Sequence, residues 1–464
     1  MNNLWSSIQR KSVSLLNKYL TGKSIDYKQI IALIIPIFVD QTFMIMMSLL
    51  NTAMISSSGV AAVSAVSIVD SLNLFLANIF IAVATGGTVI VAQYKGNGNQ
   101  EMVSKAASQA ISTVTVLSIG VGAAVIIFHA PILTLLFGQA EMDVLELARI
   151  FLIGSCISYP FIALFQAVIG VLRGVSDTKA CLGLSVIMNT IFLGLNIIFI
   201  MVLDMGVIGL VISLIIARIL GVAAALVYLF KYNHTLFINL KDILKVNISI
   251  VRKIMLIGLP FAAEQLFFNG GKLLTQTFIV QLGTLALTVN AISASISMVF
   301  QIGGSALSIA IVTVVGQCIG RRDIEDARKF IKSFIGLSTI FFVVASAFIL
   351  PLFPIIVQMF TPPPEIIPEI LALTLLIAIA QPLLWSISFI MPSALRAAGD
   401  ANFTSIISML SMWLVRIVLG YVLGITLQFG LMGVWVAMVI EWSVRGFIFT
   451  WRFRGDKWYS RKLI

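Results

Sequence analysis

Two acidic residues stand at matching places in apolar parts of the chain, where they could exchange a cation. Asp40 and Glu264 each lie four residues after a proline, Pro36 or Pro260, and each is followed by a glutamine. A proline inside a helix removes a backbone hydrogen bond and can kink the helix. Burial favours the neutral form of a carboxyl group and a nearby cation favours the charged form. A carboxylate balanced between these effects can bind H⁺ or Na⁺ on one side of a membrane and release it on the other.

Asp40 and Glu264 are therefore candidate cation-coupling residues. The alternative for each is a carboxylate fixed in a static ion pair, and Lys272, two helical turns after Glu264, is one possible partner. A further group of polar or soft side chains could line a substrate cavity, because methionine and polar groups adapt to varied amphipathic ligands. Any one of them could instead serve ordinary helix packing. The candidates are Gln41, Met44, Asp70, Asn73, Asn189, Asn196, Gln265, Lys272, Asn290 and Gln381.

More charges fall inside the apolar stretches and must avoid lipid. A charged side chain near the centre of a membrane helix costs about 2.5–3.5 kcal/mol on insertion scales. Glu441 and Arg445 are four residues apart, which predicts an ion pair on one helix with a structural role. Arg218 and Arg416 are expected to find carbonyls or acids on neighbouring helices.

The elements that carry these residues are membrane helices. The chain of 464 residues is 59% hydrophobic and 11% charged, whereas soluble proteins carry roughly 25% charged residues. Segments such as 273–320 hold no Asp, Glu, Lys or Arg. Lipid offers no hydrogen-bond partners, so such segments form helices or a closed barrel, and barrel strands would alternate in polarity. The sequence predicts an all-α polytopic membrane protein with twelve transmembrane helices at 30–52, 62–92, 106–129, 148–171, 180–203, 207–230, 254–281, 285–316, 333–354, 370–393, 402–424 and 430–451.

The two halves of the chain repeat each other at an offset of about 224 residues. Pro36 matches Pro260, and Gly59 matches Gly283. Six spans per half is an even number, so both halves enter the membrane with the same orientation, and transporter sites tend to lie between such repeats. We expect two pseudo-symmetric six-helix bundles, with the following division of the chain: a cytoplasmic N-terminal segment at 1–29, lobes at 30–230 and 254–451, a cytoplasmic linker at 231–253 and a cytoplasmic tail at 452–464.

The positive charges are distributed unevenly between the loops. The termini and one set of loops hold 25 of the 30 Lys and Arg residues, while the opposite loops are mainly acidic. This is the positive-inside pattern, which places both termini in the cytoplasm. The net charge of +11 is thus explained without a nucleic-acid partner. We expect a multi-pass protein of a bacterial cytoplasmic (inner) membrane.

Enzymatic function is not expected. The chain contains no GxxxxGK[ST], HExxH or GxSxG motif. Its three cysteines, Cys156, Cys181 and Cys318, are too widely spaced to indicate a disulfide framework or a metal cluster. We therefore expect no metal and no cofactor other than the coupling ion.

The ordered set of motifs resembles the multidrug and toxic compound extrusion (MATE) family over about 28–452. The resemblance rests on Pro36…Asp40-Gln41, Gln93…Gly96, Leu172-Arg173-Gly174-Val175-Ser176-Asp177-Thr178-Lys179 and Gly206…Gly209, repeated as Pro260…Glu264, Gln317…Gly320, Leu395…Asp400 and Gly430…Gly433. It implies two six-helix lobes that rock to export drugs in exchange for H⁺ or Na⁺.

The resemblance also bears on the coupling ion. Asp40 matches the first-span aspartate of proton-linked members, and Glu264 looks like the seventh-span glutamate of sodium-linked and eukaryotic members. The tenth span, 370–393, lacks the aspartate of sodium-linked members, and Ile200 stands where some members have Asp. We favour H⁺, because a single carboxylate can carry a proton whereas Na⁺ needs several oxygen ligands.

The leading hypothesis is a monomeric antiporter that exports amphipathic, cationic compounds in exchange for H⁺ or Na⁺. One alternative is a flippase of the same superfamily that moves lipid-linked oligosaccharides or lipids. The cavity acids argue against an anionic cargo, whereas Lys272 and Arg416 favour one. Another alternative is a membrane sensor or scaffold without transport.

Overall fold

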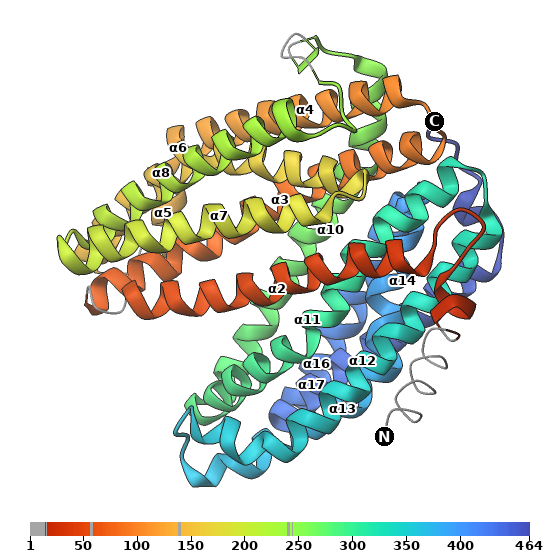
Figure 1. Cartoon of the computed structure of the whole chain (residues 1–464). Helices are drawn as coiled ribbons and strands as arrows, with labels where there is room; N and C mark the ends of the chain where they lie inside the picture. Colours follow the sequence, from red (N-terminus) through yellow and green to blue (C-terminus); the bar gives the residue numbers. More distant parts are fainter. Residues whose placement is uncertain (1–13, 15, 56–58, 138–140, 239–241, 244) are drawn as a thin grey trace, which may run out of the picture. The chain divides into compact units, whose positions relative to one another are not determined.

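The computed structural model describes residues 14, 16–55, 59–137, 141–238, 242–243 and 245–464. Part of the predicted N-terminal segment, 1–13 and 15, lies outside these residues. The described chain is helical throughout and contains no β-strand (Figure 1).

Each of the twelve predicted spans lies within one helix or a run of consecutive helices, with at most two of its residues beyond the helix end, so the fold class is confirmed. These are α2 (Tyr27–Ile55), α3 (Val60–Gly96), α4 (Gln100–Ile127), α6 (Met142–Gly174), α7 (Thr178–Asn196) with η2 (Ile197–Val202), α8 (Gly206–Val227) with η3 (Tyr228–Tyr232), α10 (Ile248–Gln281), α11 (Thr284–Gly320), α12 (Ile324–Gln358), α13 (Ile367–Ala380) with η5 (Gln381–Trp385) and α14 (Ser386–Ala397), α15 (Ala401–Leu410) with η6 (Ser411–Ile417), α16 (Val418–Tyr421) and η7 (Val422–Thr426), and α17 (Gly430–Arg454). Short helices α5 (His129–Phe137), η4 (Pro364–Ile366) and η8 (Lys457–Tyr459) lie between or after them.

Eleven of these helices or runs, within the described residues, are long and apolar enough to cross a membrane. The remaining span is α10, which carries Glu264 and Lys272 together with several amide side chains. This span holds Glu264, one of the two candidate coupling residues.

The repeat is visible in the backbone. Gly59 and Gly283, 224 residues apart, precede α3 and α11 and have φ angles of 93° and 99°. Only glycine adopts this region readily, because it has no Cβ. Asn99 and Asp323 then cap α4 and α12, accepting hydrogen bonds from the backbone N–H groups of Met102 and Asp326. A glycine with a positive φ angle therefore precedes the second span of both halves, and a side-chain N-cap precedes the third span of both halves.

The chain divides into two compact units. The N-terminal unit comprises Val39–Gln265, and the C-terminal unit comprises the chain up to Phe38 together with Leu266–Ile464. The chain passes between the units inside α2, after Phe38, and inside α10, after Gln265. Each unit therefore contains the first part of a helix that continues into the other unit, whereas the predicted lobes are divided at the linker.

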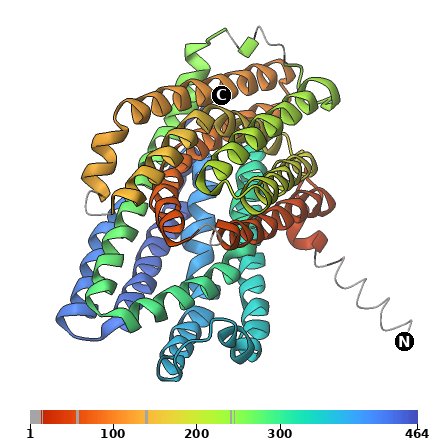
Figure 2. The same cartoon turned by 90° about the vertical axis from the view of Figure 1, so that its left-hand side faces the viewer.

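In the N-terminal unit, the long helices lie side by side in both views (Figure 1 and Figure 2), and α3 packs against α4 and α6. Glycines let α3 approach the first part of α10. A Cβ on Gly86 would lie 2.5 Å from the carbonyl oxygen of Ile254, and one on Gly258 would lie 2.8 Å from the Cα of Val83. The two helices thus meet backbone to backbone.

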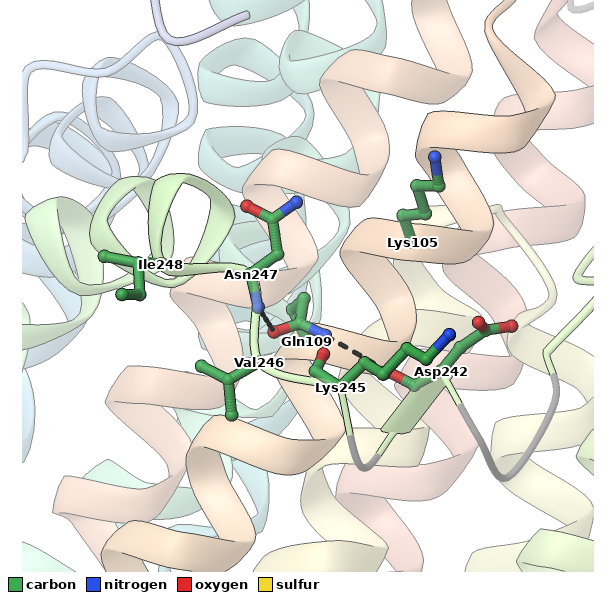
Figure 3. Close-up of a pocket in the computed structure, with 7 residues that line it drawn as sticks. All are labelled: Lys105, Gln109, Asp242, Lys245, Val246, Asn247 and Ile248. Atoms are coloured by element: carbon green, nitrogen blue, oxygen red, sulfur yellow. Dashed lines mark hydrogen bonds between the residues drawn. The ribbon is translucent and has the colours of Figure 1, made fainter.

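The linker before α10 is bound along α4, as Figure 3 shows. Gln109 of α4 donates to the carbonyl oxygens of Asp242 and Lys245, at 3.2 and 2.6 Å, and accepts from the backbone N–H of Asn247 at 2.8 Å. A pocket of about 420 Å³ lies beside these contacts. Gln109 therefore fixes the start of α10, and we assign the pocket to this structural connection.

In the C-terminal unit, α11 packs against α12 and α14. The first part of α2 joins this unit through Phe38, whose ring centre lies 5.7 Å from that of Phe341 of α12. Between α14 and α15, Asp400 accepts two hydrogen bonds from Arg452 of α17, at 2.7 and 3.1 Å.

Candidate functional site

Asp40 is buried on α2 and paired with a single arginine. Its side chain is 7% exposed, and Oδ2 lies 3.3 Å from Nη2 of Arg173, near the end of α6. Its other oxygen, Oδ1, is buried and has no hydrogen-bond partner among the described residues. Both residues belong to the N-terminal unit. Asp40 therefore links α2 to the end of α6 through one of its two carboxylate oxygens.

The face of α2 that carries Asp40 contacts α7 further along the chain. The sulfur of Met44 accepts from the Ser185 hydroxyl at 3.9 Å and from Nδ2 of Asn189 at 3.6 Å. Further along, Nδ2 of the fully buried Asn196 donates to Asn51 at 3.3 Å. Residues four and eleven positions after Asp40 lie on the same helical face. The structure thus places Met44 in contact with Asn189, on the face of α2 that carries Asp40 and that meets Asn196 further along. Gln41 lies half-buried on α2.

Asp70 and Asn73 belong to a separate polar network in the same unit. Asn73 donates to Asp70 at 3.4 Å and to the hydroxyl of Ser155 at 3.0 Å, and it accepts from Tyr159 at 2.6 Å. Arg218 of α8 interacts electrostatically with Asp70. The contacts join α3 to α6 and α8, and the side chain of Asp70 remains exposed at one edge.

Among the described residues, the acid of the second repeat, Glu264, is not paired with the lysine named above as its possible partner. Glu264 is buried in α10, and Gln265 is half-buried beside it. Lys272 forms no ion pair with Glu264 in the described part of the chain. Its Nζ lies instead 5.0 Å from the ring centre of Phe268.

Two predicted cavity residues hold helices of the C-terminal unit together. Asn290 accepts from the indole N–H of Trp435 at 3.0 Å, and its Nδ2 donates to Gln276 at 3.4 Å. Gln381 is fully buried in η5 and donates to the hydroxyl of Ser297 at 3.0 Å. These contacts join α11 to α10, α17 and η5, and a cavity role for either residue stays a prediction.

The predicted ion pair within α17 is confirmed, and a second arginine from another helix joins it. Arg445 lies 3.3 Å from one carboxylate oxygen of Glu441, and Arg416 lies 2.9 Å from the other. Ser411 also donates to Glu441, at 3.1 Å. Arg416 thus finds an acid on a neighbouring helix, as its position in an apolar span requires.

Sequence reasoning did not single out Arg173 as the partner of Asp40. The signal was present, because the Leu172-Arg173 pair that ends the fourth span is repeated as Leu395-Arg396. Arg396 is also buried, at 4% exposure. An arginine repeated at the end of a span in both halves is a candidate partner for a repeated acid in the first span.

Comparison with known proteins places the fold and the repeat in a family. The MatE family model matches the chain twice, over residues 36–202 and 260–422, so the second match begins 224 residues after the first. The structure resembles a crystal structure of MATE in the straight conformation and one in the bent conformation. Each has a TM-score of 0.84, with 19% and 20% identity, covering 92% and 96% of this chain and 95% and 97% of the other.

Bacterial relatives match over nearly their whole length. An uncharacterized transporter, YisQ of Bacillus subtilis, is 29% identical over 92% of this chain and 94% of its own. A probable multidrug resistance protein, NorM of Thermotoga maritima, is 27% identical over 97% of both chains. The two matches of the family model cover most of the sequence, and the chain belongs to the MATE family of efflux transporters.

Proposed function

We propose that this protein is an antiporter that exports amphipathic small molecules in exchange for H⁺ bound at Asp40. The observation that carries the proposal is the buried pair of Asp40 and Arg173, in which one carboxylate oxygen has no described partner. A proton can neutralise this carboxylate without any further ligand. Na⁺ needs several oxygen ligands, whereas this pair offers one carboxylate oxygen without a described partner, so we favour H⁺ over Na⁺.

The position of Asp40 in the chain suggests how its charge acts. It lies two residues after the point where α2 leaves the C-terminal unit, and Glu264 lies two residues before the point where α10 enters it. Protonation of Asp40 would loosen α2 from α6 next to this crossing. A bound ion or cargo can shift the equilibrium between two conformations only by its different affinity for them.

The cargo is proposed to be amphipathic and, at the N-terminal unit, cationic. The exposed carboxylate of Asp70 and the adaptable face formed by Met44 and Asn189 support this assignment. The multidrug resistance name of the NorM relative is consistent with it. We further propose a monomer in a bacterial cytoplasmic membrane. The positive-inside pattern supports a cytoplasmic location for both termini.

The experiment is ethidium flux in proteoliposomes of the purified chain, with imposed H⁺ and Na⁺ gradients compared separately. We expect the H⁺ gradient to drive accumulation and the Na⁺ gradient to have no effect. Flux driven by Na⁺ alone would refute the choice of ion. The absence of flux of any tested amphipathic compound under either gradient would refute antiport and favour a sensor or scaffold.

A further inference from the structure

The C-terminal unit contains a cluster of three basic side chains and one acid. Arg416 and Arg445 both contact Glu441, and the three side chains are 7%, 3% and 0% exposed. Lys272 of α10 adds a third cation, which interacts electrostatically with Arg416. We call Lys272, Arg416, Glu441 and Arg445 the basic cluster. With all four groups charged, it carries a net charge of +2.

The three cations of the basic cluster surround one aromatic ring. Nζ of Lys272 lies 5.0 Å from the centre of the Phe268 ring, and the guanidinium carbons of Arg416 and Arg445 lie 5.5 and 5.9 Å from it. Arg445 also lies 4.2 Å from the ring centre of Phe389. Cations within about 6 Å of a ring centre are attracted to its face. These rings offset part of the charge, but they cannot replace a counter-ion.

The hydrogen-bond donors of the basic cluster are incompletely used. Nε of Arg416 and both Nε and Nη2 of Arg445 are buried and have no hydrogen-bond partner among the described residues. Lys272 forms no ion pair with a carboxylate in that same part of the chain, since the one acid of the cluster is already shared by two arginines. A buried charged donor without a partner is costly. The arrangement is therefore short of one anionic, oxygen-bearing group.

The local backbone supports a binding role. Ser411 and Arg416 lie in η6, a π-helical segment whose wider turn places residues five apart on one face. This lets both side chains reach Glu441, whereas an α-helical turn would direct them apart. Segments of this kind occur frequently at functional sites.

The basic cluster can also be reached from outside the unit. The side chain of Lys272 is exposed and Phe268 is half-buried, although both arginines are buried. A lysine in the interior of a membrane span does not remain in contact with lipid. Lys272 is thus the entry point through which a ligand could meet the buried guanidinium groups.

We propose that the basic cluster binds the anionic group, a carboxylate or a phosphate, of an amphipathic compound whose apolar body packs against Phe268. Arg guanidinium groups bind carboxylate and phosphate with good geometry. As a statement about cargo the proposal rests on the proposed function, but binding itself is measurable without transport. A lipid headgroup and a soluble organic anion offer the same chemistry, and the experiment separates them.

The test uses the full chain in detergent and two fluorescent probes of opposite charge, the anion carboxyfluorescein and the cation ethidium, with binding followed by anisotropy. Lys272→Met should weaken carboxyfluorescein binding about tenfold, the loss expected for one charge-assisted contact. Lys272→Arg should restore binding. Ethidium affinity should be unchanged in both variants. Lys332→Met, the same substitution at an exposed lysine of α12, is the matched control and should bind both probes like the wild type.

The outcomes separate the proposal from the proposed function. Displacement of carboxyfluorescein by benzoate or inorganic phosphate would identify a soluble anion, and displacement by short-chain phosphatidic acid alone would identify a lipid headgroup; either supports the site. Failure of the wild type to bind the anion, or an equal loss of both probes in Lys272→Met, would overturn it. Specific anion binding without flux would refute antiport alone, and ethidium flux without anion binding would refute the site alone.

Discussion

Replacing Asp40 by asparagine is expected to uncouple export from the proton gradient while leaving the protein folded. Asparagine keeps the shape of the side chain and an oxygen that can accept from Arg173, but it cannot bind a proton. The contact of 3.3 Å is longer than the 2.7–2.9 Å of a strong charge-assisted bond, and the two side chains are 7% and 19% exposed. Breaking a buried pair costs about 3–5 kcal/mol and an exposed pair about 0.2–1 kcal/mol. We therefore expect Asp40→Asn to cost about 2 kcal/mol of stability.

A matched control is available in the C-terminal unit. Asp400 pairs with Arg452 through two contacts, and the side chains are 13% and 18% exposed, which is similar burial. Asp400→Asn should cost at least as much stability as Asp40→Asn, because its geometry is better. It should nevertheless leave proton-driven export in place, since Asp400 has no proposed part in coupling.

The assay compares both variants with the wild type in proteoliposomes at equal reconstituted amounts, with ethidium flux under an imposed pH gradient and thermal stability measured on the same preparations. The reasoning predicts loss of gradient-driven flux in Asp40→Asn and its retention in Asp400→Asn. If Asp40→Asn kept a proton-driven rate close to that of the wild type, Asp40 would not be the coupling group. If both variants lost flux in proportion to their stability, the effect would be structural.

Three further predictions concern packing and topology. Glu441→Gln should destabilise the chain by about 3–5 kcal/mol in thermal unfolding, because it leaves Arg416 and Arg445 buried without an acid; an unchanged melting temperature would contradict this account. Gly86→Ala should destabilise by about 1–3 kcal/mol, since its Cβ would lie 2.5 Å from a backbone oxygen of α10. Gly183→Ala in α7, whose Cβ meets nothing within 4 Å, should be neutral or stabilising by up to about 1 kcal/mol. Since all three native cysteines are buried, an impermeant maleimide applied to intact cells should label Glu365→Cys and not Lys332→Cys, and the reverse result would invert the topology.

The spans and the repeat could be predicted because both depend on local properties of the chain. Long segments without charges must be helical in lipid, whatever surrounds them. Gly59 and Gly283 carry the repeat because a positive φ angle at a helix start strongly restricts the residue type. Neither inference requires knowledge of which helices are neighbours. The ion pair of Glu441 and Arg445 was predictable for the same reason, since its partners are one helical turn apart.

The repeat makes Arg173 a candidate partner for Asp40, but one sequence does not specify which distant helices are in contact. Arg173 lies 133 residues from Asp40, and no local pattern specifies that the end of α6 lies beside α2. The π-helical segment η6 (Ser411–Ile417) packs against α17, a contact between helices that one sequence does not specify. The passage of α2 and α10 between units likewise depends on tertiary packing, so a division at the polar linker was the natural expectation from composition.

The two repeats share their backbone but differ in the charge of their interiors. In the N-terminal unit, Asp40 is paired with one arginine, whereas the basic cluster of the C-terminal unit has a net charge of +2. Under our two proposals, a proton acts in one unit and an anionic group of the cargo in the other. Coupling between two sites is reciprocal in binding free energy. If protonation of Asp40 changes the affinity of the basic cluster for carboxyfluorescein, saturating carboxyfluorescein must change the proton affinity of Asp40 by the same factor. We propose that this linkage acts through α2 and α10, because each of these helices belongs to both units.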